Sequence, residues 1–378
     1  MNRKKTKLVS KLVLTFSLIF FSSLVMFASG DKKKGHDDKK GNPVNTQEEI
    51  NEYIVHHTKD SHDFHLFSYF SDGEEHHVGF PLPVMLYGSE GFTAFLSSEF
   101  HHDDSGHVIV TKGNSNFVKL HGKIYELEKG AKKVDFDEDH HPTNATLPID
   151  LSITKSVFGI LLFGLLLFFM FRNLAKQYKK KQIPTGFGRV LEPLVIYVRD
   201  EIAKPNIGHK YNKFMGLLMT VFFFIWFSNL MGLLPFGFNV TGQLAVTTSL
   251  ALLTFVVYLA SSNGHFWSHQ LWMPGVPYLL RPILAVIELA GTLIIKPFSL
   301  AIRLFANITA GHIVVMSLIA IGIAMQKDLT IYGSTILSLI LSLFITLIEV
   351  LVAFLQAYIF TMLSALFIGI AVEEPEHH

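Results

Sequence analysis

Two apolar stretches near the C-terminal end constrain this chain more than any other feature. Residues 283–325 and 331–372 each hold about forty residues with almost no charge, and a helix of that length is about 60 Å long. The hydrocarbon core of a bilayer is only about 30 Å thick. We therefore expect two membrane helices that tilt steeply, bend, or lie against another protein within the bilayer.

Three shorter apolar segments precede these two. Residues 151–171, 214–234 and 244–261 are each about twenty residues long, which is enough to cross a bilayer as a helix. Between the first and the second, residues 188–204 alternate charged and apolar positions at helical spacing. That pattern predicts an amphipathic helix on the cytoplasmic surface, so we expect about five membrane helices and one surface helix.

The distribution of positive charge predicts the orientation. Residues 151–378 carry 15 Lys and Arg against 9 Asp and Glu. By the positive-inside rule, four lysines place the end of the first apolar segment in the cytoplasm; these are Lys176, Lys179, Lys180 and Lys181. The residues before that segment then lie outside, and the C-terminus is cytoplasmic. The stretch with His265, His269 and Pro274 is expected to be a cytoplasmic loop.

The N-terminus has the pattern of an export signal. Five basic residues among the first eleven precede an apolar run from Leu12 to Ala28, and small residues occupy positions 28–30. We predict a signal peptide over residues 1–30, with an uncleaved anchor as the alternative because the apolar run is somewhat long. Both interpretations deliver residues 31–150 to the outside.

Residues 31–150 are predicted to form an acidic, histidine-rich external domain. They carry 12 Lys and Arg against 22 Asp and Glu, and they hold 13 of the 19 histidines. Residues 31–46 are charged and predict a flexible tether. Short alternating apolar runs between residues 54 and 127 predict a small β-rich fold. We find no enzyme motif in this domain.

The histidine clusters of this domain suggest two interpretations. Residues 56–65, 74–77, 101–104 and 137–141 offer many Zn or Cu ligands. Adjacent histidines on a strand point to opposite faces, however, and none of these runs has the spacing of a closed four-ligand site. We therefore favour solvated or proton-buffering histidines over a specific metal site. The chain has no cysteine, which excludes disulfides and iron–sulfur clusters.

The first long apolar segment also holds costly polar residues. A charge at bilayer depth costs about 3 kcal/mol or more, and a guanidinium group stays protonated. At 100° per residue, one helix face carries Lys296, Ser299, Arg303 and Asn307. His312 lies on the opposite side. An interhelical contact would explain a single Ser or Asn, but Arg303 requires a function or a counter-charge.

The second long segment repeats polar residues at intervals of seven. Its polar face holds Ser342, Thr346, Glu349 and Gln356. If the two segments form a hairpin that turns on the outer side, Glu349 lies at the depth of His312. Gln356 then lies at the depth of Arg303. The first pair would handle protons, and the second would combine an electrostatic barrier with a hydrogen-bonding neighbour.

Three motifs of this region resemble subunit a of the rotary (F-type) ATP synthase. They are KPFSLAIRLFANITAGH (residues 296–312), LQAYIFTMLSALFI (355–368) and FSNLMGLLPF (227–236), in the family's order. The resemblance covers roughly residues 150–372. It implies an all-α polytopic membrane domain over residues 151–378, with the last two helices nearly horizontal along a ring of c subunits, behind a small β-rich external domain.

The resemblance also implies roles for single residues. Arg303 matches the family's essential arginine, which faces the c ring, and Gln356 matches a glutamine near it. His312 and Glu349 match two proton-channel positions. Glu288 lies one residue out of register with an acidic residue toward the cytoplasmic half-channel. The candidate proton-translocation residues are therefore Arg303, His312, Glu349, Gln356, Asn307, Lys296, Ser299 and Glu288.

A stator function follows from the resemblance. In that family two proton half-channels lead to a carboxylate of the c ring, and the arginine between them prevents a short circuit. The chain would then be a non-catalytic subunit in a bacterial inner membrane, with the c-subunit ring and the b-subunit stalk as partners. It has no GxxxxGK[ST] motif, and we expect no cofactor, metal or nucleic acid. His312 and Glu349 favour H⁺ over Na⁺.

An ion-coupled secondary transporter or channel is the alternative, because such proteins also carry Arg, Glu and His within the membrane. Against it, the sequence has no internal repeat and no pair of broken helices. Copurification with an oligomeric ring of small subunits would distinguish the two.

Overall fold

The computed structural model describes ten stretches of the chain. They are residues 60–71, 74–101, 103–128, 130–131, 133–136, 142–180, 184–233, 239–272, 275–324 and 331–373. The predicted signal peptide (1–30) and tether (31–46) lie outside these residues. The chain divides into two compact units, residues 59–165 and residues 166–378 with the N-terminal residues. Each unit is described here by itself.

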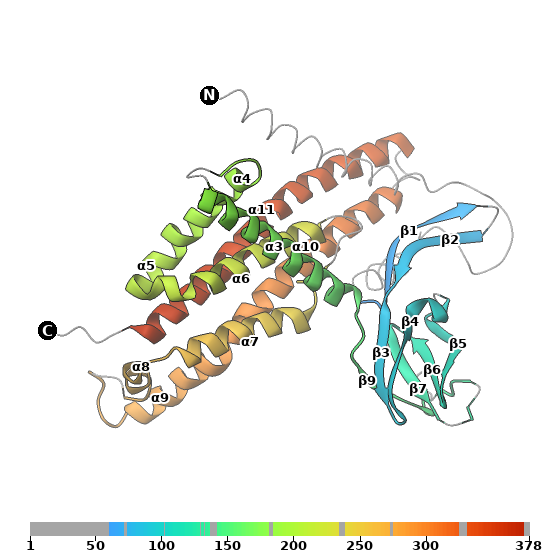
Figure 1. Cartoon of the computed structure of the whole chain (residues 1–378), viewed down its shortest axis with the longest axis horizontal. Coiled ribbons are helices and arrows are strands. Elements are labelled where there is room, and N and C mark those ends of the chain that lie inside the picture. The colour runs from blue at the N-terminus through green and yellow to red at the C-terminus, as the bar shows by residue number, and fades with distance from the viewer. Residues whose placement is uncertain are drawn as a thin grey trace. The chain divides into compact units, whose positions relative to one another are not determined.

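The first unit is built from antiparallel strands (Figure 1). β1 (Asp63–Ser71) and β2 (Glu74–Pro81) form a hairpin. β3 (Pro83–Gly88) lies between β4 (Gly91–Leu96) and β9 (Ile149–Asp150). A second sheet has β5 (Ser105–Lys112), β6 (Ser115–Leu120), β7 (Lys123–Leu127) and β8 (Ala145–Thr146) in that order. A short 3₁₀ helix, η1 (Ser97–Phe100), follows β4. The predicted β-rich fold is confirmed.

Alternation along the strands produces the core of this unit. Val84 and Leu86 of β3 point inward together with Phe95 of β4. The Phe95 ring lies 5.6 Å from the Phe100 ring and 5.8 Å from the Phe117 ring, measured between centroids. These contacts join the two sheets around one hydrophobic cluster.

The second unit is helical. α3 (Lys155–Lys180) begins in the first unit and ends in this one. Then follow α4 (Gly188–Tyr197), the π-helical η2 (Val198–Ala203), α5 (Lys204–Ile207), the 3₁₀ turn η3 (Gly208–Lys210) and α6 (Tyr211–Gly232). The remaining elements are α7 (Leu244–Ala260), α8 (Gly264–Leu271), α9 (Arg281–Ala290), the π-helical η4 (Gly291–Ile295), α10 (Lys296–Ala324) and α11 (Ile331–Val372).

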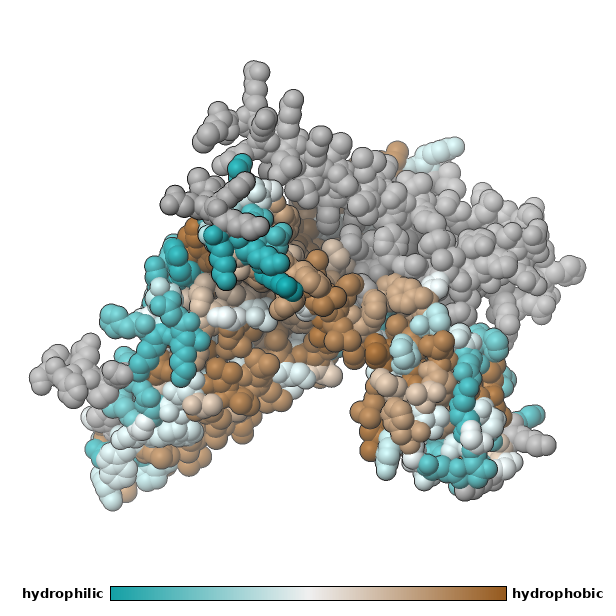
Figure 2. Space-filling view, in the orientation of Figure 1, coloured by the Kyte–Doolittle hydropathy of each residue, from teal (hydrophilic) through white to brown (hydrophobic). Residues whose placement is uncertain are grey.

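These helices have the length and composition of membrane spans. In the described part of the chain, four helical stretches are long and apolar enough to cross a bilayer, or five if α7 and α8, which meet at a bend of 101°, count as one. Apolar side chains cover much of the visible face of this unit (Figure 2). The expected polytopic membrane fold with a small β domain is therefore confirmed.

The two longest helices lie side by side, and α6 packs against α11 while α7 packs against α10 (Figure 1). Leu218, Phe222 and Phe223 of α6 are buried in this core. At Gly369 of α11 the backbone carbonyl of Asn206 occupies the space that a β-carbon would need. Glycine therefore permits the close approach of α5 to α11.

The C-terminal end of α11 is held by two other segments. The last carbonyls of a helix lack intrahelical partners. Here the Val372 carbonyl accepts hydrogen bonds from Lys210 Nζ and from Asn263 Nδ2, both at 3.1 Å. The backbone amide of Asn263 donates to the Ala371 carbonyl at 2.9 Å. The end of this 42-residue helix is thus fixed in place.

The structure differs from the sequence-based expectation at three places. Leu151 does not begin the first membrane helix, because its amide donates to the Met85 carbonyl at 2.9 Å and α3 starts only at Lys155. The expected loop after α7 contains α8. The stretch expected as one unit over residues 283–325 is continuous, but it contains the π-helical turn η4, which the sequence did not predict.

Residues 188–204 are helical, as predicted. They form α4, all of η2 and the first residue of α5. Val198, Ile202 and Ala203 are fully buried in the core of the helical unit. Their charged residues lie on the other side, where Arg199 and Lys204 each make an ion pair with Asp200. The pattern therefore marks one buried face and one polar face. The location at the membrane surface stays a prediction.

Candidate functional site

One face of α10 carries polar side chains that no described part of the chain covers. Ser299, Arg303 and Asn307 are exposed, whereas Leu300 and Leu304 next to them are buried. The exposed face continues with small residues, Ala306 and Ala310, which leave room for another helix to approach. Four residues of α10 were predicted to share a face, and three of them, Ser299, Arg303 and Asn307, lie together on an exposed face.

Arg303 has no partner within the described residues. Its guanidinium group makes neither a hydrogen bond nor an ion pair with them. In a helix of this hydrophobicity an unpaired guanidinium group is costly. A counter-charge at this face would offset that cost, and none of the described residues supplies it.

Gln356 lies in a different environment. It is only 4% exposed, in the part of α11 that packs within the helical unit. No hydrogen bond joins it to Arg303 in the described structure. The predicted pairing of Arg303 with Gln356 is thus not formed in this chain alone.

Glu349 of α11 lies against α10. A β-carbon placed on Gly311 would be 2.5 Å from Glu349 Oε1, so the glycine makes room for the carboxyl group. Oε1 is buried and has no hydrogen-bond partner among the described residues. His312 follows Gly311 in α10, but its side chain lies outside the described residues. The predicted contact between Glu349 and His312 stays a prediction.

A second polar cluster lies where α8 meets the start of α10. Gln270 of α8 is buried, and its amide nitrogen donates to Glu288 Oε1 at 3.1 Å and to Thr292 Oγ1 at 2.5 Å. It also donates to the Glu288 backbone carbonyl at 3.1 Å. Lys296 Nζ donates to Thr292 Oγ1 at 3.2 Å. Thr292 thus links Lys296 to Gln270 and, through Gln270, to Glu288.

The π-helical turn η4 explains how Glu288 reaches this cluster. Eight residues separate Glu288 from Lys296, and in a regular α-helix they would differ by about 80° around the axis. A π turn takes up one additional residue. The eight residues then span about two turns, so Glu288, Thr292 and Lys296 share a face.

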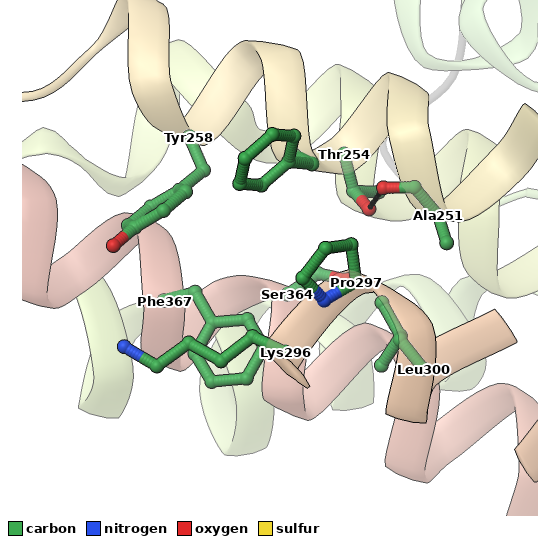
Figure 3. Close-up of a pocket in the computed structure, with 9 residues that line it drawn as sticks. Ala251, Thr254, Tyr258, Lys296, Pro297, Leu300, Ser364 and Phe367 are labelled. Carbon is green, nitrogen blue, oxygen red and sulfur yellow. Dashed lines mark hydrogen bonds between the residues drawn. The ribbon is translucent and has the colours of Figure 1, made fainter. Parts of the chain in front are cut away.

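Lys296 does not lie on the exposed face of α10 that carries Arg303. Its side chain is half-buried and lines a small cavity between α7, α10 and α11 (Figure 3). The ammonium group lies 5.4 Å from the centre of the Phe367 ring and 6.0 Å from that of Tyr258, which are distances of cation–π contacts. The cavity has a volume of about 10 Å³, which is room for about one water molecule.

Some polar residues of this region were not singled out from the sequence. Gln270 lay in the expected loop, and Thr292 resembles an ordinary helix residue. Asn229, within the motif FSNLMGLLPF, is buried; its Oδ1 accepts a hydrogen bond from Thr241 Oγ1 at 2.6 Å. Its Nδ2 donates to the Ala353 carbonyl at 3.5 Å. Asn229 thereby connects α6 to α11 near the site, and a buried Asn in an apolar run was the available signal.

The metal hypothesis gains no support from the structure. Among the described residues, no three His, Asp or Glu side chains are grouped so that they could hold a metal ion. Many of the clustered histidines, such as His56, His57 and residues 137–141, lie outside the described residues. The favoured interpretation as solvated histidines stays a prediction.

Comparison with known proteins assigns the helical part of the chain to a protein family. Residues 157–369, more than half of the sequence, match the family described as ATP synthase A chain. The chain belongs to this family. All eight candidate proton-translocation residues of this A chain lie within the matched segment.

Three relatives from the A chain family align with this chain over most of their own length. The chain is 42% identical to ATP synthase subunit a 2 of Chlorobaculum tepidum over 249 residues, which cover 64% of this chain and 70% of the relative. It is 41% identical to ATP synthase subunit a 2 of Prosthecochloris aestuarii over 286 residues, or 73% of this chain and 86% of the relative. ATP synthase subunit a of Myxococcus xanthus is 41% identical over 237 residues, or 61% and 76%.

The β-rich part of this A chain has a match of its own. Residues 53–151 match a family described as Domain of unknown function (DUF8433). That match ends just before α3 begins at Lys155.

Proposed function

We propose that this chain is the stator subunit of the proton channel of a bacterial F-type ATP synthase. The single observation that carries the proposal is that Arg303 is exposed in the middle of an apolar helix and has no partner among the described residues, in a chain of the ATP synthase A chain family. Such a charge is stable at bilayer depth only with a partner. The partner in this proposal is a carboxylate on a rotating ring of c subunits, a separate chain.

The chemistry follows from the permanent charge of Arg303. A ring carboxylate that moves through lipid must be protonated, because a lone carboxylate is too costly there. Beside Arg303 the opposite charge favours the ionised form, so the carboxyl group releases its proton. Arginine does not give up its own proton. It therefore separates two proton paths instead of joining them.

Glu349 supports a proton path on the outer side of Arg303. Its carboxyl group lies against α10 at Gly311, with a buried oxygen that no described residue satisfies. In the proposal it exchanges protons with water and with His312, because histidine is the side chain whose ordinary pKa lies nearest neutral pH. Asn307 and Gln356 would orient Arg303 or hydrogen-bond to the passing carboxylate.

The cluster of Gln270, Glu288, Thr292 and Lys296 supports the second path, on the cytoplasmic side. It brings a carboxylate, an amide, a hydroxyl and an ammonium group into one hydrogen-bonded series next to a cavity. Ser299 lies between this cluster and Arg303 along α10. Such a series can pass protons when one or two water molecules complete it.

The cellular arrangement in this proposal follows the charge distribution. The chain is a multi-pass membrane protein, and we infer that residues 31–150 are periplasmic after removal of residues 1–30 and that the C-terminus is cytoplasmic. The four lysines from Lys176 to Lys181 support this orientation. The inferred partners are the c-subunit ring and the b-subunit stalk, and the chain itself performs no catalysis.

The proposal is tested by proton pumping in inverted membrane vesicles that carry Arg303→Ala, driven by ATP. We expect pumping to be lost while the purified complex still contains this chain. Ile302→Ala, a partly exposed apolar neighbour in the same helix turn, is the matched control and should pump normally. Pumping at the wild-type rate by Arg303→Ala in an assembled complex would refute the proposal and favour a transporter.

A further inference from the structure

The sheet formed by β4, β3 and β9 has an unusual outer face. Antiparallel sheets that bury one face normally turn polar residues toward water on the other. Here the outward side chains of Tyr87, Phe92 and Ile149 are 54%, 62% and 63% exposed. Large apolar side chains at that exposure need an explanation when they are adjacent.

The strand register places these residues together. Tyr87 pairs with Phe92 of β4 on one side and with Ile149 of β9 on the other, and paired residues point to the same face. The other outward pairs are Pro83 with Leu96 and Met85 with Ala94. We call this set the apolar sheet face: Pro83, Met85, Tyr87, Phe92, Ala94, Leu96 and Ile149. In Figure 2 apolar surface lies over the region that β3 and β9 occupy in Figure 1.

The apolar sheet face is a local feature of this domain. None of its seven residues is charged. The four-stranded sheet, by contrast, exposes polar side chains such as His107, Thr111 and Lys123. Residues 31–150 as a whole have ten more acidic than basic residues. The absence of charge on this one face therefore does not reflect the composition of the domain.

Hydrogen bonds fasten this sheet to the start of α3. The amide of Leu151 donates to the Met85 carbonyl at 2.9 Å, and the amide of Ile153 donates to the Pro83 carbonyl at 3.1 Å. Lys155, two residues later, is the first residue of α3. Even an extended chain of four residues, from Leu151 to Lys155, spans at most about 14 Å. The apolar sheet face therefore stays within a short distance of the end of a membrane helix.

A second set of contacts stiffens the same junction. Asp60 Oδ1 accepts a hydrogen bond from the Ser156 amide at 3.0 Å, and the Ser61 carbonyl accepts one from the Lys155 amide at 2.8 Å. The ring of Phe158, one turn into α3, lies 5.5 Å from that of Phe80. The residues before β1 and Phe80 of β2 thus both hold the first turn of the helix.

We propose that the apolar sheet face rests on the lipid surface beside the start of α3. The ligand is the interfacial layer of the bilayer, where aromatic and aliphatic side chains of this kind are stable. No charge is desolvated by this contact. Because the junction between the sheet and α3 is short, lipid is always close to the apolar sheet face, which corresponds to a high effective concentration. A soluble protein could bind this face only by displacing that lipid.

The cysteine-free sequence allows a direct test with spin labels. Phe92→Cys, Leu96→Cys and Ile149→Cys each place one nitroxide on the apolar sheet face, and all three positions are exposed, so the core is not changed. Lys123→Cys, on an exposed polar position of β7, is the matched control. The labelled chain is studied within the assembled complex in liposomes, and collisions with oxygen and with a water-soluble nickel chelate are measured.

Lipid contact predicts that oxygen collides more often than the nickel chelate at the three sites, with the reverse at Lys123→Cys. Frequent collisions with the nickel chelate at all three sites would show a face open to water and overturn the proposal. Protection from both reagents would show that another protein segment or subunit covers the face, which would also overturn it. Because three sites are labelled separately, the result does not depend on a single variant that folds poorly.

Discussion

At the residue scale, the two cations of α10 have opposite surroundings. Arg303 is exposed and has no partner among the described residues, whereas Lys296 is half-buried, donates to Thr292 and lies over two aromatic rings. Seven residues separate them, so helical periodicity alone assigns them to one face. The difference arises from the neighbours of each residue, because Thr292, Tyr258 and Phe367 surround the Lys296 side chain and no described residue covers Arg303. The different surroundings of Lys296 and Arg303 could be seen only in the three-dimensional structure.

Gln270 provides a test of the cluster around Glu288. In Gln270→Leu, Glu288 and Thr292 lose a buried donor, which costs about 1–3 kcal/mol. We expect ATP-driven proton pumping to fall several-fold while the chain still assembles, because the hydrogen-bonded series is interrupted. The measurement is pumping by inverted vesicles at equal content of the complex.

The matched control for Gln270 is its neighbour His269, which is exposed on the same short helix. His269→Ala should leave pumping unchanged. If Gln270→Leu pumps as well as His269→Ala, the cluster does not lie on a proton path.

The ion pair between His62 and Asp150 predicts a pH dependence of stability. Burial raises the pKa of Asp150, but the hydrogen bonds from His62 and Ser152 outweigh it and lower the pKa from 3.8 to about 2. A lowered folded-state pKa stabilises the domain above the unfolded value, and this stabilisation is lost as the pH falls from about 4 toward 2. Because the Asp150 side chain is 35% exposed, we expect a contribution of only about 1 kcal/mol.

Asp150→Asn should therefore lower the melting temperature of the β-rich domain at pH 7, and the difference from wild type should shrink as the pH approaches 3. Thermal unfolding of the full chain in detergent, followed at several pH values with a probe in this domain, measures both effects. An unchanged difference between pH 7 and pH 3 would contradict the assignment.

At the element scale, hydrophobic length predicted most of the helices. α3, α6, α7, α10 and α11 all coincide with apolar segments, because a span of lipid demands a minimum run of apolar residues. α8 was missed since its eight residues, GHFWSHQL, are too short and too polar to show a helical period. The π turn η4 was missed for a different reason, because composition does not encode one additional residue in a turn.

The close approach of α5 to α11 predicts a strong effect of one methyl group. In Gly369→Ala the new β-carbon would overlap the backbone carbonyl of Asn206, which cannot rotate away. We expect little of this variant in the membrane fraction, as measured by immunoblot against wild type. Gly216→Ala is the control, because nothing lies within 4 Å of its β-carbon position and alanine favours helix. Equal amounts of both variants would contradict the packing described.

At the scale of the whole molecule, sequence and structure divide the chain at nearly the same place. The A chain family matches residues 157–369, and a separate family matches residues 53–151. All candidate site residues lie in the first of these segments. Alternating apolar runs were enough to predict a β-rich external fold, but not its sheet pairing, because register depends on turns and on partners far away in the sequence.

This division predicts that the β-rich domain is not needed for proton flow. Replacement of residues 60–150 by a short Gly/Ser linker, with residues 1–59 retained, should leave ATP-driven pumping near the wild-type rate in vesicles that contain equal amounts of complex. The reason is that no residue of the proposed proton paths is removed. Loss of pumping in an assembled complex would show that the domain takes part in conduction.

The fixed end of α11 has a mechanical consequence. Asn229 of α6 holds the same helix again at the Ala353 carbonyl, about 29 Å before Val372 at 1.5 Å per residue. A sideways load on α11 is therefore carried at both points, and the stretch between them, which holds Gln356, is supported at its two ends like a short bridge.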